Sequence, residues 1–215
     1  MQDLNDLFTI ETPEKIVHVL TKLFNSQDNS PWKEKIKILG KNIQKTDGSK
    51  TDGIMSQYSF AKEIIKLIYG GGKSYFALRD ILKEKNKRIS LKNEKSFNSF
   101  SDKYIFWDYY VNDNEQYIYQ TLLAYFMAIQ NKFDGWGDKD YILSKTTGYI
   151  AFMKFYKDIF SKETDKEKLT QNKYFETIFQ KIKDSNKLKE LKSNNYPSGI
   201  KGQNELYNDL IEGNK

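Results

Sequence analysis

The sequence contains no cysteine and only one histidine among its 215 residues. Without cysteine the chain cannot form disulfides, thiolate metal sites or a cysteine nucleophile. The single imidazole, His18, excludes a multi-histidine metal site. Because His18 lies between apolar positions of an amphipathic segment, we interpret it as a surface or boundary residue and not as a catalyst.

Long apolar runs are also missing from the chain. No stretch approaches the roughly 18 apolar residues that a membrane-spanning helix needs. The N-terminal residues lack the basic region and apolar core of a signal peptide. We therefore expect a cytoplasmic protein that has no membrane partner.

Aromatic residues, in contrast, are abundant. Hydrophobic residues make up 38% of the chain and aromatic residues 15%, which is enough to bury a sizeable core. Apolar residues recur at helical spacing in most segments, so we predict a mainly α-helical bundle of about seven or eight helices. We expect residues 1–215 to form a single helical domain, with C-terminal helices in residues 170–213. The alternation over residues 35–39 indicates a short strand, which with a partner strand would make a small β-hairpin.

Positive charge is concentrated in one part of the chain. The net charge is +6, whereas residues 31–103 hold 17 basic and 8 acidic residues. Such a local excess favours nucleic acid as a partner, because lysine and arginine neutralise phosphates. The alternative is a solvated lysine-rich surface without a specific ligand.

The most apolar helix is predicted near residues 144–160 and should be the core helix of the domain. Ser144, Thr146 and Thr147 are candidates for its N-cap. Gly148 costs about 1 kcal/mol relative to alanine inside a helix, so its presence suggests that another backbone or a ligand comes close. Lys145, Thr146 and Thr147 could hold a phosphate at this helix start. Alternatively, the threonines cap the helix, Gly148 packs closely and Lys145 is solvated.

A second basic cluster follows the sequence Gly72-Lys73-Ser74. This triplet lacks the first glycine and the preceding strand of a nucleotide-binding P-loop, so we interpret it as a stop followed by a helix from Ser74 to about Lys87. The end of that helix carries the cations Lys83, Lys85, Lys87 and Arg88. Cations at a helix C-terminus interact favourably with the helix dipole even without a ligand. These four residues are also candidates for phosphate binding.

Two tryptophans have structural interpretations. Trp32 should anchor the chain after a turn-rich break, and Trp136 should hold the turn at residues 134–140. The aromatic run at residues 104–111 could stack on bases if it were exposed, but we expect it to belong to the core. We find no catalytic constellation in the sequence, and we expect neither enzymatic activity nor a cofactor or metal.

The order of several short motifs is similar to that in the C-terminal half of DGQHR-domain proteins. The motifs are SPW at 30–32, IKI at 36–38, GIMSQ at 53–57, LSKTTG at 143–148, and SG at 198–199 followed by GQ at 202–203. This resemblance spans most of residues 13–211 and implies a bacterial origin in a DNA-modification or phage-defence system. The name-giving Asp-Gly-Gln-His-Arg motif and its ParB-like half are not in this chain. It would therefore be a short family member or a separate C-terminal half.

Two functions follow from these observations. The first is a non-enzymatic DNA-associated module that binds backbone phosphates. The second is a helical protein–protein interaction domain that docks to a partner subunit without contacting DNA, which the aromatic excess favours.

Overall fold

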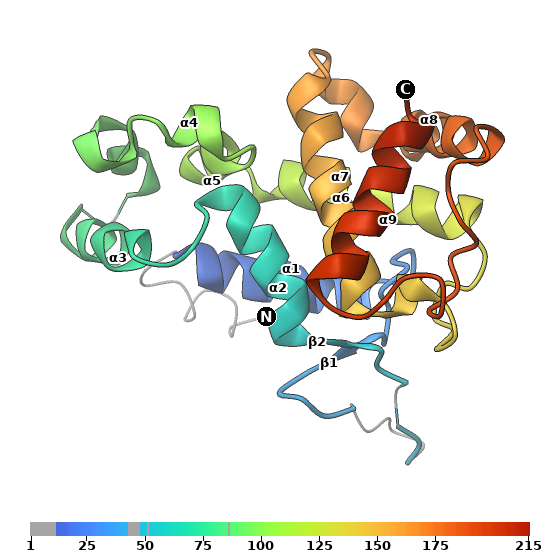
Figure 1. The fold of residues 1–215 in the computed structure, drawn as a ribbon. Helices are drawn as coiled ribbons and strands as arrows, with labels where there is room; N and C mark the ends of the chain where they lie inside the picture. The colour runs from blue at the N-terminus through green and yellow to red at the C-terminus, as the bar shows by residue number, and fades with distance from the viewer. Residues whose placement is uncertain (1–11, 43–47, 51, 86) are drawn as a thin grey trace. The chain divides into compact units, whose positions relative to one another are not determined.

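The computed structural model describes residues 12–42, 48–50, 52–85 and 87–215. The fold is mainly α-helical, as predicted (Figure 1). The described ranges contain nine α-helical segments, where seven or eight helices were expected. Two of the nine, α4 and α5, have five residues or fewer. The α-helices are α1 (Pro13–Ser26), α2 (Gln57–Ile68), α3 (Ser74–Lys85), α4 (Phe100–Lys103), α5 (Trp107–Val111), α6 (Glu115–Lys132), α7 (Thr146–Lys162), α8 (Asn172–Asp184) and α9 (Ile200–Gly213). The 3-10 turns are η1 (Arg88–Asn93), η2 (Lys95–Phe97), η3 (Ile142–Ser144) and η4 (Lys166–Thr170).

Local sequence signals set several helix starts. Pro13 is the first residue of α1, where its fixed φ suits the helix and its missing N–H costs nothing. Ser56 precedes α2, and its Oγ accepts a hydrogen bond from the Ser59 N–H at 3.0 Å. This is the N-cap geometry that is typical of serine.

The predicted β-hairpin is wrong. Strand β1 (Ile36–Lys37) pairs with β2 (Met55–Ser56), but the two strands run parallel. A hairpin turn joins antiparallel strands, whereas a parallel pair needs a long connection, here residues 38–54. Alternation along one strand predicts extended backbone and contains no information about the direction of its partner.

The chain divides into two compact units, one made of residues 1–22 and 61–119 and the other of residues 23–60 and 120–215. The basic segment 31–103 is therefore shared between them. The description of residues 1–215 as one domain stays a prediction. We describe the units separately as the first unit and the second unit.

The core of the first unit contains the aromatic run that the sequence assigns to a core. Phe106, Trp107 and Tyr110 are buried, and the Trp107 ring lies 4.9 Å from that of Phe100 between centroids. Helix α3 contributes only Leu78 and Leu82 as buried residues. Most of the surface of α3 is therefore exposed.

The core of the second unit is an aromatic cluster around Trp32. This ring is 1% exposed and lies within 5.6 Å, between centroids, of the rings of Phe60, Phe126, Trp136 and Tyr149. The Trp136 Nε1–H donates to the carbonyl of Pro31 at 2.8 Å, which attaches the loop at residues 134–140 to this cluster. Helix α7 contributes ten buried residues to the core, more than half of its length.

Candidate nucleic-acid interface

The start of α7 is built from a 3-10 turn that folds against the helix. The turn η3 ends at Ser144, and Lys145 then has extended backbone before the helix begins at Thr146. The Lys145 N–H donates to the carbonyl of Ile142 at 3.0 Å. A Cβ on Gly148 would lie 2.1 Å from that same carbonyl oxygen. Gly148 is therefore required because the backbone of the turn lies directly against the helix.

The expected capping roles are wrong for all three hydroxyl side chains. Lys145 is the N-cap residue, and no side chain caps the helix. Thr146 Oγ1 donates to the Met55 sulfur at 3.6 Å, while Thr147 Oγ1 accepts from the Gly199 N–H at 3.3 Å. The turn η3 displaces the helix start to Thr146, which places Ser144 before the cap position.

Donors remain available at this helix start. Lys145 is exposed, and its ammonium makes no hydrogen bond or ion pair with any residue that the structure describes. The first N–H groups of an α-helix have no partner within the helix. Ser144 is 4% exposed, and its hydroxyl also lacks a hydrogen-bond partner among the described residues.

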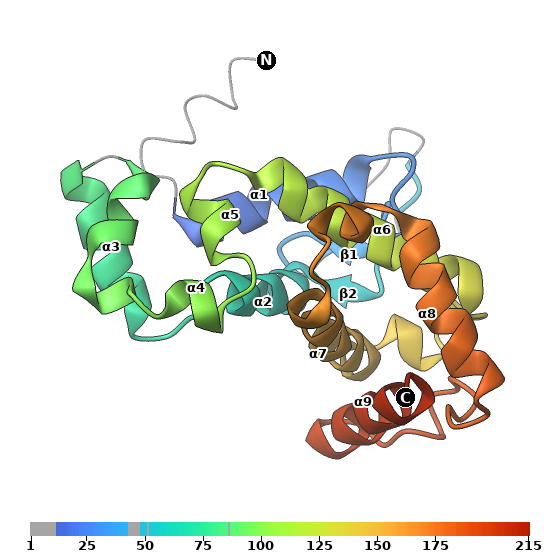
Figure 2. The ribbon, with the colours of Figure 1, turned by 90° about the horizontal axis from the view of Figure 1, so that it is seen from above.

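Helix α9 lies beside α7 and runs in the same direction. Three hydrogen bonds join residues that advance in the same order along both helices. They link Thr147 with Gly199, Lys154 with Asn204 at 3.0 Å, and Asp158 with Tyr207. Both views show the two helices side by side (Figures 1 and 2). Their N-termini therefore lie together, and we call this region, formed by residues 145–147 and 199–201, the paired N-terminal end.

Close packing of a second glycine permits this arrangement. Gly202 is buried in the first turn of α9, where a Cβ would lie 1.7 Å from the carbonyl oxygen of Pro197. The segment before α9 thus folds against the helix start, as η3 does at α7. Gly199 has φ +82°, a backbone conformation that suits glycine and turns the chain into α9.

The two ends of this helix pair differ in charge. At the C-terminal ends, Lys166 Nζ donates to the carbonyls of Phe160 at 2.5 Å and Glu163 at 2.7 Å, and Lys181 Nζ donates to that of Asn214 at 2.9 Å. Burial lowers the pKa of Lys166. These cations neutralise the negative ends of the helix dipoles.

The N-terminal ends have no corresponding anion. Neither α7 nor α9 has an acidic residue in its first turn, and neither N-cap makes a side-chain capping bond. Lys145 and Lys201 lie there instead, with the Lys201 side chain 79% exposed and its Nζ 4.0 Å from a Glu205 oxygen. Two parallel helices add their positive ends at one place, so the field at the paired N-terminal end favours an anion.

The second predicted cluster is only partly a free basic surface. Helix α3 extends to Lys85, close to the predicted end, and Lys87 has the extended backbone that precedes η1. Lys83 and Lys87 are exposed. Lys85 Nζ forms an ion pair with Glu94 at 2.5 Å. Three of these predicted residues are therefore on the surface, and one of the three already has an acidic partner.

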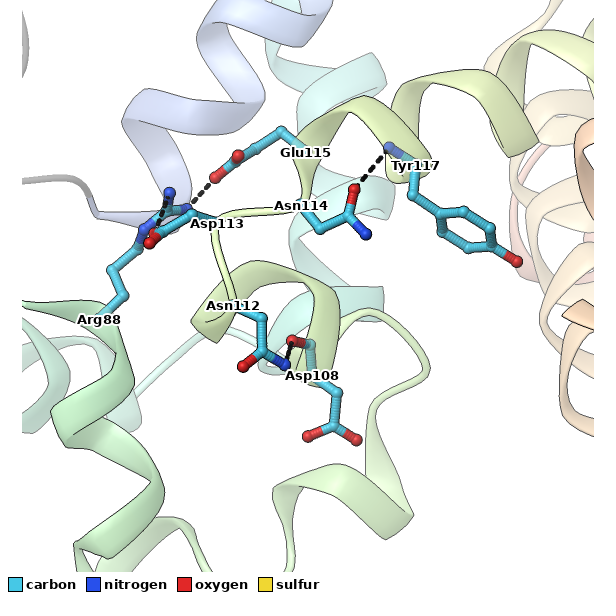
Figure 3. Close-up of polar contacts among 7 residues, drawn as sticks. All are labelled: Arg88, Asp108, Asn112, Asp113, Asn114, Glu115 and Tyr117. Carbon is cyan, nitrogen blue, oxygen red and sulfur yellow. Dashed lines mark hydrogen bonds and ion pairs between the residues drawn. The ribbon is translucent and has the colours of Figure 1, made fainter. Parts of the chain in front are cut away.

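Arg88 is buried in an ion-pair network of the first unit. Its side chain is 5% exposed, lies 2.5 Å from an Asp113 oxygen and also contacts the carboxylate of Glu115. Its guanidinium lies 5.1 Å from the centre of the Tyr110 ring. Figure 3 shows Arg88 facing the turn that joins α5 to α6. We therefore leave Arg88 out of the phosphate-binding hypothesis.

The same turn contains the cap of α6. The Asn114 side chain accepts from the Tyr117 N–H at 3.3 Å (Figure 3). Asn112 donates from Nδ2 to the carbonyl of Asp108 at 2.7 Å, and Asp113 has φ +56°. Asp113 also forms the ion pair with Arg88, and α6 begins at Glu115, directly after Asn114.

Sequence reasoning assigned no role to Lys201. It recognised Gly199 and Gly202 before the last helix but could not show that this helix begins beside α7. A lysine in the first turn, where acidic residues are usual, was the available signal. The pairing of two distant helix starts cannot be deduced from local patterns.

Burial, together with Lys22, lowers the pKa of His18, which is half-buried on α1. Among the described residues, no group of three histidine, aspartate or glutamate side chains is placed to bind a metal ion. No described helix has the length and apolar character required to cross a membrane. Comparison with protein-family models finds no match, and searches of curated proteins and solved structures find no significant match either.

Proposed function

We propose that this protein is a non-enzymatic DNA-associated module that holds backbone phosphates at the paired N-terminal end of α7 and α9. The observation that carries the proposal is the charge asymmetry of this helix pair. Lysines neutralise the C-terminal carbonyls, whereas the first turns at the N-termini have exposed lysines and no acidic residue, with Glu205 one turn further along α9. A phosphate would provide the missing negative charge.

The chemistry of the site suits phosphate contacts and does not depend on base sequence. Lys145 and Lys201 provide ammonium groups, and the first turns provide backbone N–H groups. The net charge of +6 adds a long-range attraction to a polyanion. Thr146 and Thr147 already make hydrogen bonds inside the protein, so we assign them to positioning and not to the main phosphate contacts.

The motif order supports the biological setting of the proposal. Residues 143–148 and 198–203 carry two of the motifs that resemble DGQHR-domain proteins, and both lie at the paired N-terminal end. The resemblance links these residues to DNA-modification and phage-defence systems. The DGQHR motif itself is not in the chain, so we propose association with DNA and no chemistry on it.

Removing the two lysines tests this function. We expect the double variant Lys145→Gln, Lys201→Gln to bind duplex DNA more weakly than the wild type. Each lost phosphate contact should reduce the slope of log affinity against log salt by about 0.9, which gives about 1.8 for the pair. Fluorescence anisotropy with a labelled duplex at several salt concentrations measures this slope.

The control is a variant with the same loss of charge elsewhere in the second unit. Lys173 on α8 and Lys157 on α7 are both exposed. The double variant Lys173→Gln, Lys157→Gln should leave the slope unchanged. An equal loss of slope in the two double variants would show that net charge, and not the paired N-terminal end, determines binding. Absence of binding by the wild-type protein at low salt would refute the function itself.

Exposed apolar side chains favour a second candidate function, docking to a protein partner. In the second unit, Leu39 is 87% exposed, Tyr58 is 72% exposed and Ile200 is 73% exposed. Ile200 is the first residue of α9, so this interpretation uses part of the same region. Tyrosine is enriched in protein interfaces, and the buried centre of an interface is more apolar than its rim.

Self-association is the accessible measurement for this alternative. If the docking partner is a second copy of this chain, mass from light scattering should rise with protein concentration, and the double variant Tyr58→Ser, Ile200→Ser should remain monomeric. A constant mass for the wild-type protein, together with unchanged DNA affinity of the variant, would favour the phosphate-binding function.

A further inference from the structure

Helix α3 exposes an aromatic side chain on an otherwise polar face. Phe76 is 60% exposed, and its ring lies 5.6 Å from that of Tyr75 between centroids. The buried residues of α3 are Leu78 and Leu82, which lie on the opposite side of the helix. Phe76 therefore contributes little to the core of the first unit.

A guanidinium group lies beside these two rings. The Arg79 carbon Cζ is 5.4 Å from the centre of the Phe76 ring and 5.8 Å from that of Tyr75. Both distances are in the range of cation–π attraction. Arg79 Nη2 also lies 3.4 Å from an Asp80 oxygen, while its Nε–H has no hydrogen-bond partner among the described residues. Arg79 thus restrains the aromatic pair and keeps a positive charge next to it.

Further cations flank the aromatic pair. Lys83 lies two turns after Phe76 on the same helix face, and Lys73 lies just before the helix. Both are exposed, and neither ammonium makes a hydrogen bond or ion pair with the residues that the structure describes. Two acidic residues, Asp80 and Glu84, also lie on α3, and Asp80 is near the middle of this face.

We propose that the exposed face of α3 binds single-stranded nucleic acid, with Phe76 as the stacking platform for a base and Lys73 and Lys83 as contacts to the flanking phosphates. The combination of an exposed aromatic ring, an arginine beside it and nearby cations is the arrangement that binds unpaired strands. In a duplex the bases stack on one another, so their faces are not accessible to a side chain. The unpaired strand is therefore the partner that fits Phe76.

Charge decides between this partner and a protein. Protein interfaces are depleted in lysine at their centres. The α3 face instead places lysines around its aromatic residue and leaves them without acidic partners, which complements a phosphate chain. Asp80 opposes the phosphates, so it should weaken binding without preventing it. This site lies in the first unit, whereas the paired N-terminal end lies in the second unit.

Fluorescence anisotropy with a short labelled thymidine oligonucleotide tests the site in the full-length protein. Phe76→Ala should weaken binding by about 5-fold to 100-fold, the usual range for loss of one stacked base. Phe76→Tyr keeps an aromatic ring and should bind as the wild type does. Tyr58→Ala removes an aromatic residue of the second unit that is 72% exposed and should have no effect. Circular dichroism should show an unchanged fold for each variant.

A strand of the same length without bases separates stacking from phosphate contacts. It should bind the wild type more weakly than the thymidine strand does, and Phe76→Ala should not weaken it further. Asp80→Asn should tighten binding of both strands. A uridine strand of the same length shows whether the site prefers RNA or DNA. Tighter binding of either strand, or equal binding of both, supports the site.

Three outcomes would overturn the proposal. They are no binding of the thymidine strand by the wild type, equal affinity of Phe76→Ala and wild type, and equal affinity of the wild type for strands with and without bases. None of them changes the duplex experiment with Lys145 and Lys201, so failure here and failure of the proposed function can be distinguished.

Discussion

Replacing Gly148 with alanine is expected to destabilise the protein by about 1–3 kcal/mol, the usual cost of forcing an extra methyl group into a packed site. At an exposed helix position the same change would stabilise by about 1 kcal/mol, because alanine is the better helix former. Here the Cβ would lie 2.1 Å from the carbonyl oxygen of Ile142 and 2.8 Å from its carbon. The contact is with backbone, so no side-chain rotation can relieve it.

Urea unfolding followed by far-UV circular dichroism measures this cost as a shift of the midpoint. The matched control is Lys157→Ala, which changes an exposed residue of the same helix and should alter stability by no more than about 0.5 kcal/mol. A Gly148→Ala variant as stable as the wild type would contradict the close contact between η3 and α7.

The same variant connects packing with the proposed function. Ile142 also accepts the hydrogen bond from the Lys145 N–H, so the carbonyl that Gly148 accommodates determines where Lys145 lies. Moving this carbonyl should displace Lys145 from the paired N-terminal end. We therefore expect Gly148→Ala to weaken duplex binding under conditions where the variant remains folded.

Several elements of the fold could be predicted because their causes are local. Proline at the first position of α1, the Ser56 cap of α2 and the apolar spacing of α7 each act within a few residues. The position of Gly148 also predicted that either a backbone or a ligand would come close. The partner could not be named, because a sequence pattern does not show which carbonyl lies against a glycine.

The errors arise where distant residues determine the geometry. The parallel strand pair depends on the path of residues 38–54, and the paired N-terminal end joins segments about fifty residues apart. The acidic partners of Arg88 are equally distant in sequence, since Glu115 follows it by 27 positions. The cluster of cations at residues 83–88 therefore suggested a basic surface, although one of its members, Arg88, is buried.

Replacing Arg88 with methionine is expected to destabilise the protein by about 3 kcal/mol, because it removes one partner of a buried ion pair. The carboxylate of Glu115, whose side chain is 23% exposed, would lose its main counter-charge, and the cation over the Tyr110 ring would also be lost. Asp113 is 66% exposed and should contribute little, because water replaces its partner. Urea unfolding again gives the free energy.

The neighbouring pair of Lys85 and Glu94 provides the control, because both side chains are considerably exposed, at 42% and 30%. Lys85→Met should cost no more than about 1 kcal/mol. The double variant Arg88→Met, Glu115→Gln should recover part of the stability lost by Arg88→Met, because it no longer leaves an unpaired buried charge. If Arg88 instead served as a phosphate contact, its replacement would reduce the salt dependence of duplex binding and leave stability nearly unchanged. Burial of its guanidinium between Asp113, Glu115 and Tyr110 requires the opposite result: a large loss of stability, and an unchanged salt slope in the fraction that remains folded.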